Sequence, residues 1–128
     1  MEIASLVSRS VLTVEAGDSL RDAAVGMMER GVGSAVVVAD GMPTGIITDR
    51  DALRVIARGE DPDMVTVGGC VLKGLKTVSP DLDILEAARM MREQGFRHLV
   101  VDGEDGMVGV FSMRDLVVGL LQDRSATA

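Results

Sequence analysis

The sequence predicts an α/β protein made of two β-α-β-β-α units, related by a pseudo-twofold axis and packed through their sheets. The first observation is an internal repeat: between positions 13 and 51, twelve of 39 residues recur 64 positions later. The second is that each copy contains apolar runs typical of strands and stripes typical of helices. The third is an aliphatic composition, with two Phe and neither Tyr nor Trp. A repeat on this scale sets the architecture.

Each unit is expected to open with a short strand and an amphipathic helix. The extended pieces are residues 11–14 and 75–78. Helices should begin after Ser19 and Asp83, because each precedes an acid by three residues, as in a capping box. Apolar residues at three- and four-residue steps then give each helix one buried stripe. The expected left-handed C-caps are a glycine in each copy, Gly31 and Gly95.

Two strands and a second helix should complete each unit. Continuous, β-branched runs predict a buried strand, turn residues follow, and a returning strand leads into a helix. In the first copy these elements are expected at residues 35–39, 45–47 and 49–58. In the second copy they are expected at 99–101, 108–111 and 113–123.

The domain boundaries follow from the repeat. Residues 1–60 are expected to form the first repeat with its core at 7–58, and residues 75–124 the second. Residues 61–74 link them and could hold a short helix at 67–71; another is expected near 3–7. Residues 125–128 form a tail that should fray.

Composition limits the function. A net charge of −7 disfavours a DNA-binding surface, and the scarcity of aromatic residues argues against stacking on single strands. No apolar run approaches the length of a membrane span, and the N-terminus does not resemble a secretory signal. A single cysteine does not suggest export. We therefore expect a cytoplasmic protein without nucleic-acid or membrane partners.

The repeated motif, Gly-x-x-[Thr/Ser]-x-Arg-Asp, ends at Asp51 and at Asp115. One interpretation is structural: Thr48 or Ser112 caps a helix, the acid favours the helix dipole, and the glycine ends a hairpin turn. The other is a ligand site, since a helix N-terminus with a hydroxyl binds anions. The carboxylate could then accept hydrogen bonds from a ribose diol, and Arg50 or Arg114 could bind a phosphate. The two interpretations are compatible.

With this motif in both copies, the chain resembles a tandem pair of cystathionine-β-synthase (CBS) domains, a stand-alone Bateman module. The resemblance covers residues 7–122 and includes the similar helix-to-strand passages at 31–37 and 95–101. It implies a non-catalytic regulatory module that binds AMP, ADP, ATP or a related adenosine ligand in the cleft between the copies. It also implies a homodimer that signals to an unidentified effector protein.

The resemblance assigns roles residue by residue. Asp51 and Asp115 would hold the ribose. The phosphate contacts would come from Thr48, Arg50, Arg97, His98, Ser112 and Arg114. The adenine pocket would be lined by Leu12, Thr13, Val32, Ile46, Lys76, Thr77, Phe96 and Val110. Gly33 and Ser34 stand in the first copy where Arg97 and His98 stand in the second, so unequal sites are expected.

Alternatives remain open. The module could be a structural or dimerisation unit with a vestigial site, or could bind S-adenosylmethionine or NAD. An enzyme is disfavoured because no nucleophile–base pair or metal cluster is visible, and no metal or required cofactor is expected. Cys70 is interpreted as a buried apolar residue, and His98 could be purely structural. The few nearby cations favour a ligand with one or two phosphates, and AMP is preferred.

Overall fold

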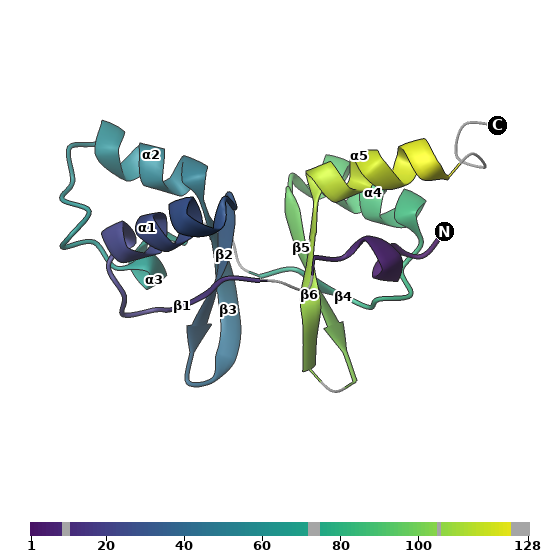
Figure 1. Ribbon diagram of the computed structural model, residues 1–128, viewed down its shortest axis with the longest axis horizontal. Coiled ribbons are helices and arrows are strands. Elements are labelled where there is room, and N and C mark those ends of the chain that lie inside the picture. The colour runs from purple at the N-terminus through teal and green to yellow at the C-terminus, as the bar shows by residue number, and fades with distance from the viewer. Residues whose placement is uncertain (9–10, 72–74, 105, 124–128) are drawn as a thin grey trace. The chain divides into compact units, whose positions relative to one another are not determined.

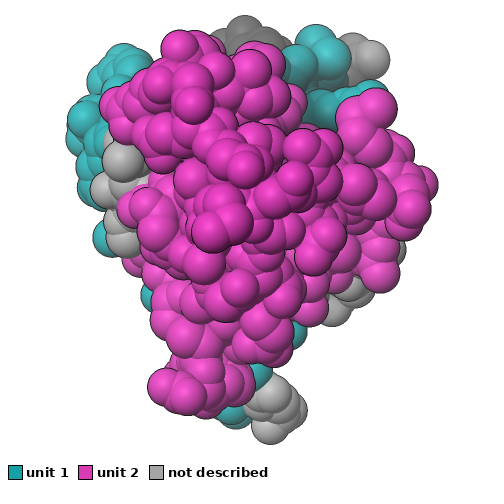
Figure 2. Space-filling view, turned by 90° about the vertical axis from the view of Figure 1, so that its left-hand side faces the viewer, with its two compact units in different colours: residues 1–10, 76–128 teal, residues 11–75 magenta. Residues whose placement is uncertain are grey.

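The computed structural model describes residues 1–8, 11–71, 75–104 and 106–123. The chain forms two compact units, coloured separately in Figure 2. The N-repeat body comprises residues 11–75, and the C-repeat body comprises residues 1–10 with 76–128. Each body contains one three-stranded sheet with its strands in chain order. The predicted α/β class is confirmed.

The N-repeat body contains six elements (Figure 1). They are β1 (Thr13–Glu15), α1 (Leu20–Arg30), β2 (Ser34–Ala39), β3 (Met42–Thr48), α2 (Asp49–Ala57) and α3 (Val67–Cys70). Strand β1 runs parallel to β2, and β2 pairs antiparallel with β3. Helices α1 and α2 lie beside one face of this sheet.

The C-repeat body repeats this order. Its elements are the 3₁₀ helix η1 (Ile3–Leu6), β4 (Thr77–Val78), α4 (Ile84–Gln94), β5 (His98–Gly103), β6 (Gly106–Ser112) and α5 (Met113–Gln122). The strand register is the same: Val100 pairs with Val110 as Val36 pairs with Ile46. Both hairpins also shift register at the equivalent step, after Val37 and after Val101.

The helix boundaries follow from the predicted caps. The Ser19 hydroxyl accepts a hydrogen bond from Asp22 N at 3.1 Å. Asp83 caps differently, because its carboxylate accepts from Leu85 N, two residues on, at 3.1 Å. The left-handed C-caps are confirmed at Gly31 (φ 64°) and Gly95 (φ 73°), where glycine avoids the Cβ clash of that conformation.

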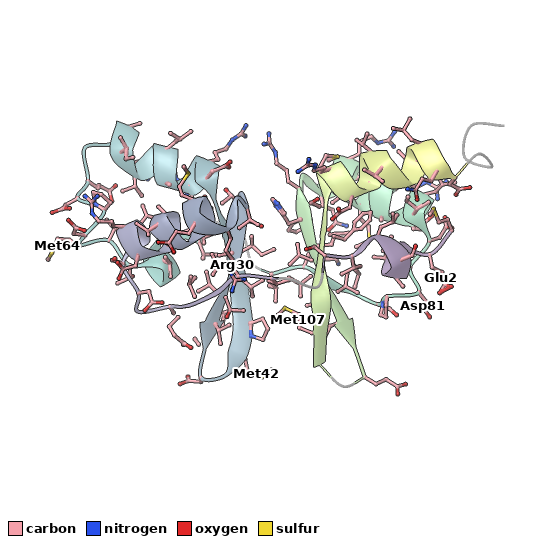
Figure 3. The ribbon with its side chains drawn as sticks, viewed as in Figure 1. Glu2, Arg30, Met42, Met64, Asp81 and Met107 are labelled. Carbon is pink, nitrogen blue, oxygen red and sulfur yellow. The ribbon has the colours of Figure 1, made fainter. Side chains whose placement is uncertain are left out.

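The two short helices do not lie in the body of the repeat that follows them. Ile3 is 0% exposed in the core of the C-repeat body, and its N–H donates to Leu82 O at 3.0 Å. Ser8 pairs with Val110 through two backbone hydrogen bonds of 3.0 Å. Figure 3 shows Glu2 and Asp81 near each other where η1 meets the loop before α4. Val67, 64 positions after Ile3, is buried in the N-repeat body. Each body is thus completed by the short helix that precedes the other repeat.

The motif glycines lie within strands, and the expectation that they end the hairpin turns is wrong. Gly45 pairs with Val37 inside β3, and Gly109 pairs with Val101 inside β6. A Cβ on Gly109 would overlap the carbonyl oxygen of Ser8, and one on Gly45 would lie 2.7 Å from Cγ1 of Val71. Glycine is therefore needed at both positions, where Val7 and Ser8 approach Gly109 and Val71 approaches Gly45.

Candidate functional site

Helices α2 and α5 both begin with a capping box, so the structural interpretation of the motif is correct. Oδ2 of Asp51 accepts hydrogen bonds from the N–H of Thr48 at 2.8 Å and from its hydroxyl at 3.1 Å. Oδ2 of Asp115 accepts the same pair from Ser112 at 2.8 and 2.9 Å. The acid and the hydroxyl of each predicted site are therefore in direct contact.

The residue that differs most between the copies lies beside each helix start. The N–H of Asp49 donates to the carbonyl of Gly33 at 3.0 Å, and the N–H of Met113 donates to that of Arg97 at 2.9 Å. These bonds attach the residue just before β2 or β5 to the first turn of the helix. The exposed Arg97 side chain therefore extends from a residue next to the Ser112–Asp115 motif. The equivalent residue of the N-repeat body, Gly33, has no side chain.

Four of the predicted adenine-wall residues, namely Thr13, Ile46, Thr77 and Val110, lie in one row of paired residues across each sheet. Thr13 pairs with Val36, which pairs with Ile46. In the C-repeat body the row is Thr77, Val100 and Val110. Paired residues point to the same face, and the alternate residues of these strands contribute to the helix-packed cores. The two rows therefore lie on the sheet faces opposite the helices.

Two of the remaining predicted residues, Leu12 and Phe96, pack against the cores of their bodies rather than along these rows. The backbone carbonyls of Leu12 and Lys76 accept hydrogen bonds from the N–H groups of Val36 and Val100 at 2.9 Å. The side chains of Leu12 and Lys76 are half-buried. Val32 is exposed, and Phe96 and His98 are half-buried. Arg50 and Arg114 are exposed in the first turns of α2 and α5, where a long cation can reach a ligand in solvent.

Arg54 is a site residue that the sequence analysis missed. Its Nη2 donates to Oδ1 of Asp51 at 2.7 Å and to the carbonyl oxygen of Cys70 at 3.1 Å. The ion pair is largely covered, with 21% of the Arg54 side chain and 13% of the Asp51 side chain exposed. The signal was available, since residues three apart on a helix are neighbours.

Cys70 is buried, as predicted, with 5% of its surface exposed. Burial raises the pKa of its thiol, and the nearby Asp51 carboxylate adds to that increase. A raised thiol pKa lowers the thiolate fraction, which is the nucleophilic form. Within the described residues, no three side chains of the metal-binding types gather, and no helix is long and apolar enough to cross a membrane.

Comparison with known proteins places this geometry in context. The model of the CBS domain family matches residues 3–58 and 67–121. The chain is 31% identical over 120 residues to an uncharacterized protein of Methanopyrus kandleri, a match that covers 91% of the chain and 61% of that protein. The chain thus spans about three fifths of that relative's length.

Two solved structures are similar over almost the whole chain. A protein with CBS domains from Burkholderia ambifaria has a TM-score of 0.88 at 28% identity, with 96% of each chain covered. A CBS domain protein from Pyrobaculum aerophilum, complexed with AMP, has a TM-score of 0.79 at 26% identity. The latter match covers 95% of this chain and 99% of that one.

Proposed function

The chain belongs to the CBS domain family, and we propose that its two CBS domains bind an adenine nucleotide, preferably AMP, and regulate a partner protein without catalysing a reaction. The observation that carries this proposal is the doubled helix start, in which a carboxylate, a hydroxyl and an arginine lie within four residues. The AMP complex of the Pyrobaculum aerophilum relative supports the choice of ligand.

The helix start of the C-repeat body supports this proposal. Oδ2 of Asp115 is held by Ser112, and among the described residues no hydrogen bond or ion pair reaches Oδ1. Oδ1 can accept a hydrogen bond from a ribose hydroxyl, because an ionised carboxylate acts only as a hydrogen-bond acceptor. The exposed Arg114 fork can meet a phosphate in two parallel bonds. The Ser112 hydroxyl would turn from Asp115 toward the phosphate.

The base would lie against the aliphatic row of the sheet. Val110 and Val100 are at least nine-tenths buried, whereas Thr77 at the end of the row is exposed. An apolar lining with a few polar groups is typical of small-molecule sites. The cations near the motifs are few, namely Arg50, Arg54, Arg97, Arg114 and Lys76, and Arg54 is already paired with Asp51. This small number favours one phosphate over three.

Exposed apolar side chains support a second copy of this chain as a partner. In the N-repeat body, Met28 is 82% exposed on α1, and an apolar groove of about 300 Å³ lies between α1 and α2. In the C-repeat body, Leu121 on α5 is 78% exposed. Large exposed apolar residues on neighbouring helices are typical of interaction surfaces. We propose a homodimer formed by these helices, whose packing a nucleotide would alter.

Calorimetric titration with AMP, ADP, ATP, S-adenosylmethionine and NAD tests the proposal, with light scattering to measure the mass. AMP should bind most tightly. Asp115→Ala should weaken its binding roughly 10- to 100-fold, as expected for a charged hydrogen-bond acceptor. Glu93→Ala removes an exposed acid from α4 and should leave binding unchanged.

The outcomes separate the alternatives. If Asp115→Ala binds AMP as the wild type does, the ribose assignment is wrong. If the wild type forms a dimer but binds none of these ligands at millimolar concentration, the chain is a structural module with a vestigial site. A different preferred ligand would leave the site intact and correct the choice of AMP.

A further inference from the structure

The two candidate ribose acceptors differ in the residue three positions further along each helix. In α2 this residue is Arg54, and in α5 it is Val118. Arg54 bonds Asp51 and also bonds Cys70 O of α3. Val118 carries no polar group, so it cannot make the equivalent contact with Asp115.

Arg54 therefore competes for the group that a ribose would need. Thr48 already uses Oδ2 of Asp51, and Arg54 uses Oδ1. A ribose hydroxyl would have to share or replace a charge-assisted hydrogen bond, which is about twice as strong as a neutral one. Because Arg54 is also held by the Cys70 carbonyl, moving it away breaks a second bond. The expected penalty is roughly tenfold or more in affinity.

The charge next to the start of α2 also disfavours a nucleotide there. Oδ2 of Asp49 lies 3.3 Å from where a Cβ on Gly33 would stand, so a carboxylate lies beside Gly33, the residue before β2. In the other copy these positions are Met113 and Arg97. A phosphate near α2 would meet a negative side chain, whereas one near α5 would meet no acid at position 113 and a cation at position 97.

We propose that the chain binds one nucleotide, through Asp115, and that Arg54 is the specificity-determining residue that closes the equivalent position at Asp51. This inference rests on the proposed nucleotide-binding function and adds its stoichiometry. The N-repeat helix start serves as a clamp, in which Arg54 joins α2 to α3. The C-repeat helix start keeps the ligand chemistry.

Exchanging the two helix residues tests the inference by calorimetric titration with AMP. The wild type should bind one AMP per chain. Arg54→Val, which installs the residue of the other copy, should add a second, weaker binding event. Combining it with Asp49→Met should strengthen that event. Val118→Arg should weaken the single wild-type event at least tenfold, because it supplies Asp115 with the same competitor.

Arg58→Gln is the matched control. It removes an exposed arginine from the end of α2 and installs the residue found at the equivalent position, Gln122. It should still bind one AMP. Circular dichroism melts establish that each variant is folded, and Arg54→Val alone decides the inference if Val118→Arg does not fold.

The possible failures are distinguishable. Two AMP per wild-type chain, or an Arg54→Val variant that still binds one, overturns the inference and leaves nucleotide binding in place. A Val118→Arg variant that is folded and binds as the wild type does also overturns it. If no variant binds AMP or another adenosine ligand, the proposed function itself is wrong, and the inference with it.

Discussion

The two bodies share a backbone and differ in the chemistry of their helix starts. Their sheets have the same register down to the shift that follows Val37 and Val101, and both α2 and α5 begin with a capping box. The side chains in the first turns have diverged. The capping geometry alone therefore does not determine which copy can hold a ligand.

Charge makes the difference concrete. In the N-repeat body the two acids Asp49 and Asp51 are balanced by Arg50 and Arg54. In the C-repeat body Arg97 and Arg114 stand against Asp115 alone. The first arrangement is neutral and internally bonded; the second has an excess positive charge and an available carboxylate oxygen. For an anionic ligand, this small local excess is more relevant than the chain's net charge of −7.

The largest expected effect concerns the glycines of the motif. Gly109→Ala should destabilise the protein by about 3 kcal/mol, because the new Cβ would overlap the backbone of Ser8, which β6 holds by two hydrogen bonds. Gly45→Ala should cost only about 1 kcal/mol, since its Cβ would meet a Val71 side chain that can move. Urea unfolding followed by circular dichroism measures both, because the chain lacks Trp and Tyr.

Equal costs for the two substitutions would contradict this comparison. They would mean that the two incoming segments are held equally firmly, or that both can shift to admit a methyl group. Gly17→Ala is a control for the loss of glycine flexibility, because a Cβ there would meet nothing within 4 Å.

A smaller difference is expected at the caps. Ser112→Ala should cost about 1 kcal/mol, because it removes the hydroxyl that donates to Asp115 and accepts from its N–H at 3.2 Å. Thr48→Ala should cost about half as much, since Arg54 still holds Asp51 at 2.7 Å. The same unfolding measurement applies. If Thr48→Ala costs as much as Ser112→Ala or more, Arg54 does not support the N-repeat cap. In an Arg54→Val background the difference should vanish, because the support is removed.

The sequence predicted what depends on local periodicity. The caps at Gly31 and Gly95, the helix stripes and the paired strands all follow from patterns within about ten residues. The placement of η1 and α3 could not be predicted in this way. The sequence pattern of one short turn with an apolar residue, such as Ile3 or Val67, is compatible with packing in either body. Only the long-range packing of these residues decides between the two.

The same distinction applies to the site. The motif located both capping boxes, since a hydroxyl three residues before an acid is a local signal. Arg54 was missed although its pairing with Asp51, three residues away, is a local signal; only its contact with Cys70 O, sixteen positions along the chain, lies beyond local patterns. The close approach of other segments to Gly45 and Gly109 was missed because those segments come from elsewhere in the chain.

The smallest expected effect concerns the two short helices and is measured by thiol labelling rather than by unfolding. Cys70 ends α3 and is the only cysteine, so a disulfide reagent labels one site. Because burial raises the pKa of its thiol, the native labelling rate should be far below that of a free thiol at pH 7. The rate should also continue to increase above pH ~8.5, where a free thiol reaches half ionisation.

Leu6, the equivalent residue of η1, provides the other half of this comparison. In a Cys70→Ala, Leu6→Cys variant the thiol would lie on a single 3₁₀ turn at a half-buried position. Such a turn opens more readily than a segment bonded by Arg54, so Cys at position 6 should react faster than Cys70. Arg54→Val should release α3 and so bring the labelling rate of Cys70 closer to the rate measured in the Leu6→Cys variant. A Cys70 rate unaffected by Arg54→Val would show that the clamp does not restrain α3, and that Arg54 acts on Asp51 alone.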